Sequence, residues 1–450
     1  MAKTLRGKAD LLHGPVLQNM LRFALPILAG TLLQQLYSMV DAVVVGQFVG
    51  KTALAAVGGS AVAIINLLLN FFVGLCSGAA IVVAQYYGAH DHENVSRAVH
   101  TATLLAVWVG AIMTVIGVCF APGLLSALDT PEDTMQYSID YMRWYFAGMI
   151  PTMIYNMGSS ILRAMGDSKR PLYFLLLCTG VNTVLDLLCV AVLRLEVAGA
   201  AIATGLSQCV GGLFPLIYFL RPNSSKLRLV RTKLELRPIL NACGNGSSEL
   251  MSNISSSIVS MIYNFQLLKY IGEDGISAYG VLMYVQFVFI AIDIGYSIGC
   301  APIVGFHFGA QNHAELKNML GKSVKLMCGA GVVMAVLAQV LAAPLARLFV
   351  GYDEVLYTLT CHAFRLFSFA FLFAGFNIFA SSFFTALNNG LISAVISFLR
   401  TLVLQTSSVI LLPLIFGVDG IWYAITAAEI FATTISVIFL FAKRKKYHYM

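Results

Sequence analysis

The chain contains an internal repeat with a period of 221–222 residues. The segment FVGLCSGAAIVVAQYYGA at 72–89 corresponds to DIGYSIGCAPIVGFHFGA at 293–310, and Ser159 corresponds to Ser381. Identities are sparse, but the offset barely changes through most of both halves. A repeat of this length predicts two copies of one structural unit, each about half of the chain.

The composition indicates that these units lie in lipid. Only 11% of the 450 residues are charged, 59% are hydrophobic, and the mean hydropathy is +0.82, whereas a soluble domain carries roughly 25% charged residues. At about 20 residues per spanning helix, there is room for about twelve spans. The nine cysteines are scattered without a CxxC pair, which is typical of small buried hydrophobic side chains and argues against disulfides or a metal site.

We therefore predict an all-α membrane protein with twelve transmembrane helices in two six-helix lobes. The helices are predicted at 16–48, 56–87, 98–120, 137–162, 170–193, 197–220, 239–269, 276–308, 322–342, 358–386, 391–416 and 419–442. The corresponding domains are an N-terminal segment 1–14, an N-lobe 15–220, a linker 221–238, a C-lobe 239–442 and a basic tail 443–450. With six helices per half, the repeats run parallel, related by an axis along the membrane normal.

The distribution of positive charge predicts the orientation. With the N-terminus in the cytoplasm, twenty of the 28 basic residues fall in cytoplasmic loops and tails and six on the opposite side, as the positive-inside rule requires. We expect both termini in the cytoplasm, a location in the cell membrane, and a retained first helix, because the segment 1–14 is polar and basic. The rule also accounts for the net charge of +7 without nucleic acid.

Acidic residues inside the first copy mark a candidate ion site. Gln34, Tyr37, Ser38 and Asp41 lie on one face of the first helix at i, i+3, i+4, i+7. Thr179, Asn182, Thr183 and Asp186 repeat that spacing on the fifth helix. Both acids lie at a depth of roughly 10 Å in the same leaflet, so Asp41 and Asp186 are expected to share one cavity.

Two carboxylates at close range repel, which favours a proton on one of them. With Asn182 and hard oxygen ligands the same place suits Na⁺. The coupling ion is therefore H⁺ or Na⁺, and no other metal or cofactor is expected. The alternative is a structural hydrogen-bond network, but an intramembrane acid is functional by default.

The second copy carries a further set of acids. Glu249 shares a helical face with Ser256, and Asp293 lies on the eighth helix; both suit a cationic substrate or a second coupling site, although polar residues also hold membrane helices together. Glu429 is expected to be structural. The repeat places no acid at the positions equivalent to these residues or to Asp41 and Asp186, so the fold does not require them.

Three further residues are candidates for substrate contact or helix bending. Met153 and Tyr284 belong to a set of soft and aromatic side chains suited to flat organic cations, although most such residues simply pack. Pro26 lies inside the first helix, where it removes a backbone hydrogen bond and permits a bend. Walker, nucleophile-elbow and zinc motifs are absent from the sequence, so an enzyme is not expected.

Several segments together resemble the multidrug and toxic compound extrusion (MATE) family over nearly the whole chain. They are Pro26 with DAVVVG at 41–46, QYYGA at 85–89, RAMGDSKRP at 163–171 and VAGAAIAT at 197–204. The resemblance implies two six-helix lobes in a V shape that export organic cations and drugs against H⁺ or Na⁺. Asp41 then matches the family's first-helix acid.

The resemblance also implies a branch of the family. Asn182 and Asp186 look like the N-lobe cation motif of DinF-like and related bacterial members, and Glu249 lies where many members carry an acid. The tenth helix lacks the acid of NorM-like members, which favours a cation site in the N-lobe over a NorM-type Na⁺ site in the C-lobe. A monomer that binds small organic cations is expected. The alternatives are a lipid-linked oligosaccharide flippase, which needs basic residues for pyrophosphate, and a passive channel or receptor, which needs no coupling acids.

Overall fold

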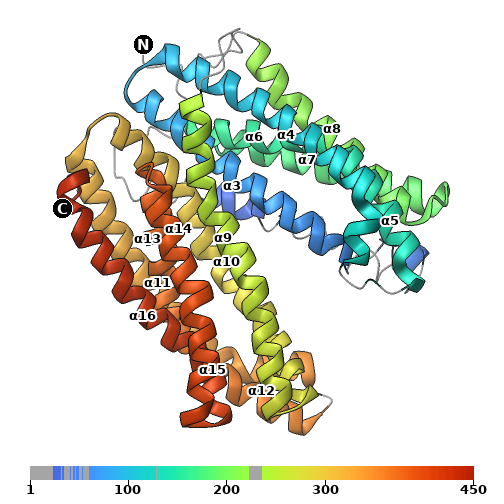
Figure 1. The fold of residues 1–450 in the computed structure, drawn as a ribbon, viewed down its shortest axis with the longest axis vertical. Coiled ribbons are helices and arrows are strands. Elements are labelled where there is room, and N and C mark those ends of the chain that lie inside the picture. Colours follow the sequence, from blue (N-terminus) through green and yellow to red (C-terminus); the bar gives the residue numbers. More distant parts are fainter. Residues whose placement is uncertain are drawn as a thin grey trace. The chain divides into compact units, whose positions relative to one another are not determined.

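The computed structural model describes residues 24–31, 33–34, 41, 44–45, 47–49, 53, 60–127, 130, 132–221, 236–351 and 353–450. All regular structure within these ranges is helical. The described residues form two compact units, one ending at Gly246 and the other running from Ser247 to Met450 (Figure 1). Most of the predicted first helix lies outside the described residues.

The helices of the first unit overlap the predicted spans, with one span divided in two. They are α3 (Ser60–Gly88), α4 (His92–Ser126), α5 (Glu132–Ala147), α6 (Met149–Ala164), α7 (Lys169–Asp186), the π-helical segment η1 (Leu187–Val192) and α8 (Glu196–Leu220). The boundary between the units falls inside α9 (Leu236–Tyr270).

The second unit repeats this order of helices. It contains α10 (Glu273–Gly309), α11 (His313–Val350), α12 (Glu354–Phe367), the 3₁₀ turn η2 (Ser368–Ala370), α13 (Phe371–Ala386), α14 (Gly390–Phe398), the π-helical segment η3 (Leu399–Leu404), α15 (Gln405–Phe416) and α16 (Val418–Tyr447). The helix α11 extends beyond the predicted 322–342 at both ends; hydropathy did not detect its polar first turns, and its last turns, after Ala342, are mainly apolar.

The sequence repeat is a repeat of structure. Helix starts in the first unit recur 221 or 222 positions later: His92 and His313, Glu132 and Glu354, Met149 and Phe371, Lys169 and Gly390, Glu196 and Val418. The caps recur as well. Asp91 accepts a hydrogen bond from the backbone of Asn94 at the start of α4, and Asn312 does the same for Glu315 at the start of α11, as side chains at N-caps do.

The predicted single helix at 137–162 is instead two helices. The helix α5 ends at Ala147 and α6 begins at Met149. Gly148 lies between them, and a Cβ there would come within 2.8 Å of the Cα of Gly205 in α8. The close approach of α8 requires a residue without a side chain, so the break is set by tertiary packing.

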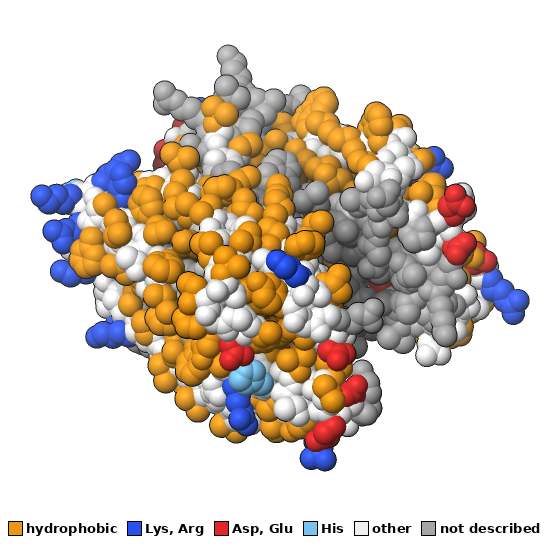
Figure 2. Space-filling model, turned by 60° about the horizontal axis from the view of Figure 1, so that its bottom comes forward, with side chains coloured by type: hydrophobic (Ala, Val, Ile, Leu, Met, Phe, Trp, Pro, Cys, Tyr) orange, Lys and Arg blue, Asp and Glu red, His pale blue; other side chains and the backbone are white. Residues whose placement is uncertain are grey.

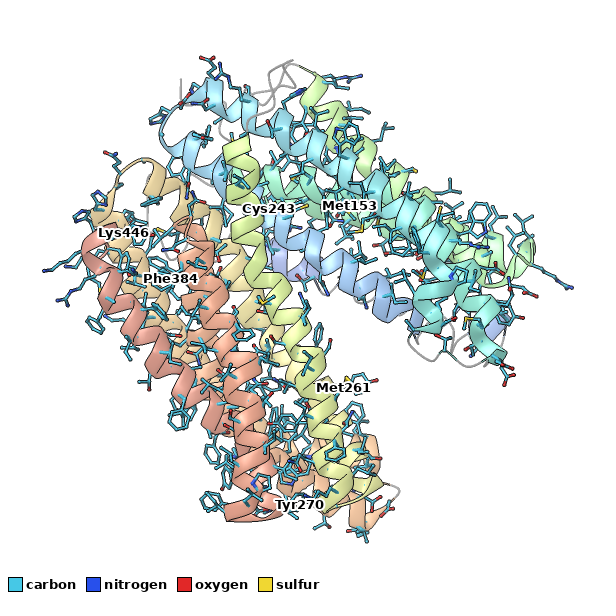
Figure 3. The ribbon with its side chains drawn as sticks, viewed as in Figure 1. Met153, Cys243, Met261, Tyr270, Phe384 and Lys446 are labelled. Atoms are coloured by element: carbon cyan, nitrogen blue, oxygen red, sulfur yellow. The ribbon has the colours of Figure 1, made fainter. Side chains whose placement is uncertain are left out.

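Each unit packs around one central helix. In the first unit α6 contacts α3, α4 and α8, and in the second unit α13 contacts α10, α11 and α16. These two helices are equivalent in the repeat. Met153 of α6 is buried and packs against Gly110 of α4 (Figure 3). The side chains on the outside of each unit are mainly apolar.

Within the described residues, nine helices are long and apolar enough to cross a membrane. Large hydrophobic side chains such as Trp108, Val184 and Ile415 are more than 60% exposed, which a water-soluble surface would not tolerate over a wide area. Hydrophobic side chains cover most of the face shown in Figure 2, with charged side chains mainly at its margins.

Candidate functional site

The first unit brings together two acids from helices far apart in the sequence. Asp41, Asn182, Asp186 and Thr204 form what we call the paired-acid cluster. Asn182 and Asp186 are fully buried and Asp41 is 6% exposed. The sequence-predicted meeting of Asp41 with Asn182 and Asp186 is therefore present in the structure.

Asn182 bridges the two carboxyl groups. With its amide nitrogen facing them, as the surrounding acceptors require, it donates to Asp41 Oδ1 at 3.0 Å and to Asp186 Oδ2 at 3.1 Å. Thr204 Oγ1 donates to Asp41 Oδ2 at 3.2 Å. Asp186 Oδ1 is buried and has no hydrogen-bond partner among the described residues.

Local structure places these side chains. Asn182 and Asp186 are four residues apart on α7, so both project from one face. Asp186 is the last residue of α7, immediately before η1, and such π-helical segments occur frequently at functional sites. The helix α8 packs along α7 and supplies Thr204.

The groups in this arrangement would suit a proton or a small cation. Asp41 and Asp186 share the amide of Asn182, and two carboxylates held this close repel each other, which favours a proton on one of them. The cluster can thus hold a proton. A Na⁺ ion would find hard oxygen ligands in the two carboxylates, the Thr204 hydroxyl and the carbonyl of a reversed Asn182 amide.

The structure describes several of the other predicted residues of the first unit. Thr183 donates its hydroxyl to the Thr179 carbonyl at 2.9 Å, and no described hydrogen bond links it to the acids. Gln34 is exposed on the described part of the first helix, where Pro26 is also helical. Tyr37 lies outside the described residues. Met153 belongs to the hydrophobic core.

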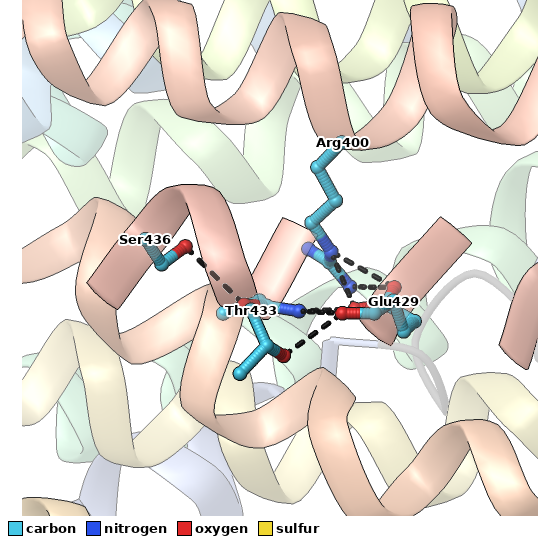
Figure 4. Close-up of polar contacts among 5 residues, drawn as sticks. Arg400, Glu429, Thr433 and Ser436 are labelled. Carbon is cyan, nitrogen blue, oxygen red and sulfur yellow. Dashed lines mark hydrogen bonds and ion pairs between the residues drawn. The ribbon is translucent and has the colours of Figure 1, made fainter. Parts of the chain in front are cut away.

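The second unit contains a different charged group, which sequence reasoning did not anticipate. Asp293, Asn377, Arg400 and Glu429 form what we call the arginine cluster. Arg400 Nε lies 2.9 and 3.0 Å from the two carboxylate oxygens of Glu429, and its Nη2 lies 2.7 Å from Oε1 (Figure 4). Asn377 Nδ2 donates to Glu429 Oε2 at 2.7 Å.

Further hydrogen bonds hold this pair in place. Ser436 donates to Asn377 Oδ1 at 3.2 Å, and Thr433 donates to the backbone carbonyl of Glu429 at 2.8 Å. Glu429 is 2% exposed and Arg400 17% exposed at the side chain. The expected structural role of Glu429 is consistent with this network.

Asp293 lies beside this ion pair, on α10. It is 1% exposed, and its Oδ1 has no hydrogen-bond partner among the described residues. The carboxyl group packs on Gly375 of α13, where a Cβ would lie 2.8 Å from Oδ1.

The remaining predicted residues of the second half do not gather here. Ser256 is exposed and donates to the Ser252 carbonyl at 2.8 Å. Tyr284 is 72% exposed and stacks on Phe349. Glu249 lies on α9, but its side chain is outside the described part of the chain.

Sequence reasoning missed three residues for different reasons. Arg400 is a lone arginine in the apolar span 391–416, and that signal alone could have marked it. Thr204 was noted only as part of a family motif, and Asn377 lies in a run of phenylalanine and alanine. Their partners are 163 and 52 residues away, so contact required the fold.

Comparison with known proteins identifies the family. The sequence profile described as MatE matches residues 26–188 and, a second time, residues 250–411. The chain belongs to the MatE family. The double match follows the internal repeat, with one copy of the profile in each half of this MatE protein, and it agrees with the resemblance seen in the motifs.

Relatives and solved structures agree with this assignment. The chain is 29% identical over 358 residues to the probable multidrug resistance protein YoeA of Bacillus subtilis, covering 76% of this chain and 75% of YoeA. It is 24% identical to the multidrug export protein MepA of Staphylococcus haemolyticus, covering 68% and 67%. A crystal structure of MATE in complex with MaL6 superimposes with a TM-score of 0.90 at 22% identity, covering 98% and 99%. The predicted fold class, twelve helices in two lobes, is that of such structures.

Proposed function

We propose that this MatE-family chain is a secondary active multidrug exporter that exchanges cationic or amphipathic organic compounds for H⁺ or Na⁺. The observation that carries the proposal is the paired-acid cluster, in which Asp41 and Asp186 share the amide of Asn182. Burying an acid in a spanning helix costs free energy, so its presence there indicates a function. Relatives named for multidrug resistance and export support the substrate class.

The proposed cycle is alternating access. In the outward-open state Asp41 and Asp186 take up the ion, which expels the substrate; in the inward-open state they release the ion and the substrate reloads. Ion and substrate must favour different states or compete, because a ligand that binds both states with equal affinity does not shift the equilibrium between them. Asn182 and Thr204 position the two carboxyl groups, and Pro26 gives the first helix freedom to bend.

We place the protein in the cell membrane as a monomer with both termini in the cytoplasm, and with the DinF-like and related bacterial branches. Glu249 of the second half contributes to recognition of the substrate's charge, and Asp293 is a second acidic site. The flippase alternative is not favoured, because the relatives are multidrug transporters and the intramembrane Arg400 is already paired with Glu429.

The proposal is tested with purified protein in liposomes loaded with ethidium, a flat organic cation. Ethidium efflux is measured under an imposed pH gradient or an imposed Na⁺ gradient. One gradient should drive uphill efflux, and Asp41→Asn should reduce it at least about tenfold, the scale of a coupling free energy of about 1–3 kcal/mol.

The matched control is Asp133→Asn, which removes an exposed acid at the start of α5 and should leave efflux unchanged. Efflux that only runs downhill under both gradients would refute antiport and indicate a passive channel. Gradient-driven efflux of wild-type size in Asp41→Asn would exclude the paired-acid cluster from coupling.

A further inference from the structure

The arginine cluster does not balance its charges. Glu429 and Asp293 are two buried acids, and Arg400 is the positive side chain that acts on both. The guanidinium directs Nε and Nη2 at Glu429. With both acids ionised, one negative charge would remain inside the membrane-spanning part of the unit.

The uncompensated group is Asp293. Glu429 receives Arg400 and Asn377, whereas Asp293 is 1% exposed and its Oδ1 is unpartnered among the described residues. A buried ionised carboxylate with an unpartnered oxygen is far more costly than a neutral carboxyl group, so such a group neutralises instead. Asp293 therefore needs a bound cation or a proton.

The surroundings of Asp293 favour the proton. Gly375 packs so tightly on the carboxyl group that a Cβ would lie 2.8 Å from Oδ1 and 3.1 Å from Oδ2. Na⁺ and other hard cations require several oxygen ligands, and the positive charge of Arg400 repels them. A proton needs neither space nor additional ligands.

Among the described residues, Arg400 from η3 and Glu429 from α16 are the charged groups close enough to act on Asp293 electrostatically. The buried side chains that α11, α12 and α13 contribute are uncharged. On its own helix, Tyr296 shares a hydrogen bond of 2.9 Å with Ser323 of α11. A movement of Arg400 relative to Asp293 would therefore change the balance between the protonated and ionised forms of Asp293.

We propose that Asp293 is a second proton-binding site, separate from the paired-acid cluster and selective for H⁺ over metal cations. While Asp293 is protonated, Glu429 is the one ionised carboxylate of the cluster, and Arg400 keeps its bonds to Glu429, as in this structure. When the proton leaves to water, two carboxylates compete for Arg400, which weakens its bonds to Glu429. Arg400 lies in the π-helical segment η3, where backbone hydrogen bonding is already irregular. The role of this site in transport rests on the proposed antiport.

Infrared spectroscopy of the full-length protein in lipid at neutral pH tests the site without transport. Protein carrying ¹³C-labelled aspartate should show the carbonyl stretch of a protonated aspartic acid. Asp293→Asn should remove one component of this band. An unchanged band in Asp293→Asn would overturn the proposal, because it would mean that Asp293 is ionised.

A second pair of variants keeps the test decisive if Asp293→Asn does not fold. Gly375→Ala should shift the frequency of the Asp293 component, because its Cβ would press on Oδ1. Gly280→Ala, on the same helix as Asp293, has open space around its Cβ and should leave the band unchanged. Identical bands in wild type and Gly375→Ala would contradict the placement of the proton on Asp293.

The same spectra separate this site from the paired-acid cluster. Asp186→Asn should remove a different component and leave the Asp293 component intact. In ethidium-loaded liposomes, Asp293→Asn should move fewer protons per ethidium than wild type while Asp41→Asn loses gradient-driven efflux. If Asp293→Asn loses its infrared component while Asp41→Asn still shows normal coupling, the paired-acid cluster is refuted as the antiport site. The proton-binding site at Asp293 is supported by the same result. An unchanged proton-to-ethidium ratio in Asp293→Asn would exclude the second site from transport.

Discussion

Glu429→Gln should destabilise the protein strongly, because it removes the negative partner of an arginine inside a membrane span. Glu429 makes three nitrogen–oxygen contacts of 2.7–3.0 Å with Arg400. The substitution keeps size and leaves an oxygen to accept from Asn377. What it removes is the charge, so the guanidinium in the segment Gly390–Phe416 loses the anion that it contacts, and the nearby Asp293 can replace that anion only by giving up its proton.

Breaking a buried ion pair by removing one partner costs about 3–5 kcal/mol. Arg400 is 17% exposed at the side chain, so hydration of its outer part offsets some of the loss, and we expect about 3 kcal/mol, the low end of that range. At 1.4 kcal/mol per factor of ten, this is roughly a 100-fold change in the unfolding equilibrium. The double variant Arg400→Gln/Glu429→Gln restores neutrality and should lie within about 1 kcal/mol of wild type, since neutral replacement of a buried pair is often tolerated.

The assay is reversible unfolding in mixed micelles titrated with sodium dodecyl sulfate, followed by helical circular dichroism. The matched control is Glu93→Gln, which breaks an exposed pair with Arg97 and should change the free energy of unfolding by about 0.3–0.5 kcal/mol. The reasoning fails if Glu429→Gln is no more destabilising than this control. It fails equally if the double variant loses the sum of the two single losses.

Three further predictions concern packing, the paired-acid cluster and the C-terminus. Gly117→Ala should lower the free energy of unfolding by about 1–3 kcal/mol, because its Cβ would overlap the Phe146 ring at 2.0 Å; Gly123→Ala on the same helix meets nothing within 4 Å and should be neutral or stabilising in the same titration. Thr204→Val should reduce gradient-driven ethidium efflux about tenfold or more, the effect of losing a hydrogen bond of about 1.5–3 kcal/mol to a charged group, whereas Thr204→Ser should retain it. Tyr449→Phe should cost about 0.5–1.5 kcal/mol, since the buried hydroxyl donates to a backbone carbonyl at 2.9 Å; equal stability would show that this bond contributes nothing.

The helix framework was largely predictable because it depends on local signals. Apolar segments of sufficient length predicted the helices of the first half, and the internal repeat predicted the equivalent helices of the second half. The polar spacing on 169–186 placed Asn182 and Asp186 on one face, and matching depth brought Asp41 to them. All of these arguments use spacing along a single helix or the thickness of the bilayer.

Features set by contacts between helices were not predictable in the same way. The break at Gly148 depends on the backbone of Gly205 in α8, and nothing in the apolar stretch around it signals a stop. Arg400 was visible as a charge, but its partner lies 29 residues further on. A charged residue in a spanning segment indicates that an opposite charge must lie nearby. Which side chain carries that charge is determined by the packing of the helices.

The two copies place their charges at non-equivalent positions, which argues that they handle ions differently. At the offset of 222 residues, Tyr263 stands for Asp41 and Ser408 for Asp186, while the threonine that contacts Asp41 recurs as Thr426. The hydroxyls of Tyr263 and Thr426 are buried without hydrogen-bond partners among the described residues, so at these positions the second copy carries hydroxyl groups and no acids. Because hydroxyls cannot exchange a proton near neutral pH as carboxyl groups do, the second copy cannot replace the paired acids at that position. Coupling lost in Asp41→Asn should therefore not be recovered by the C-terminal unit, whose own acids are arranged around an arginine instead.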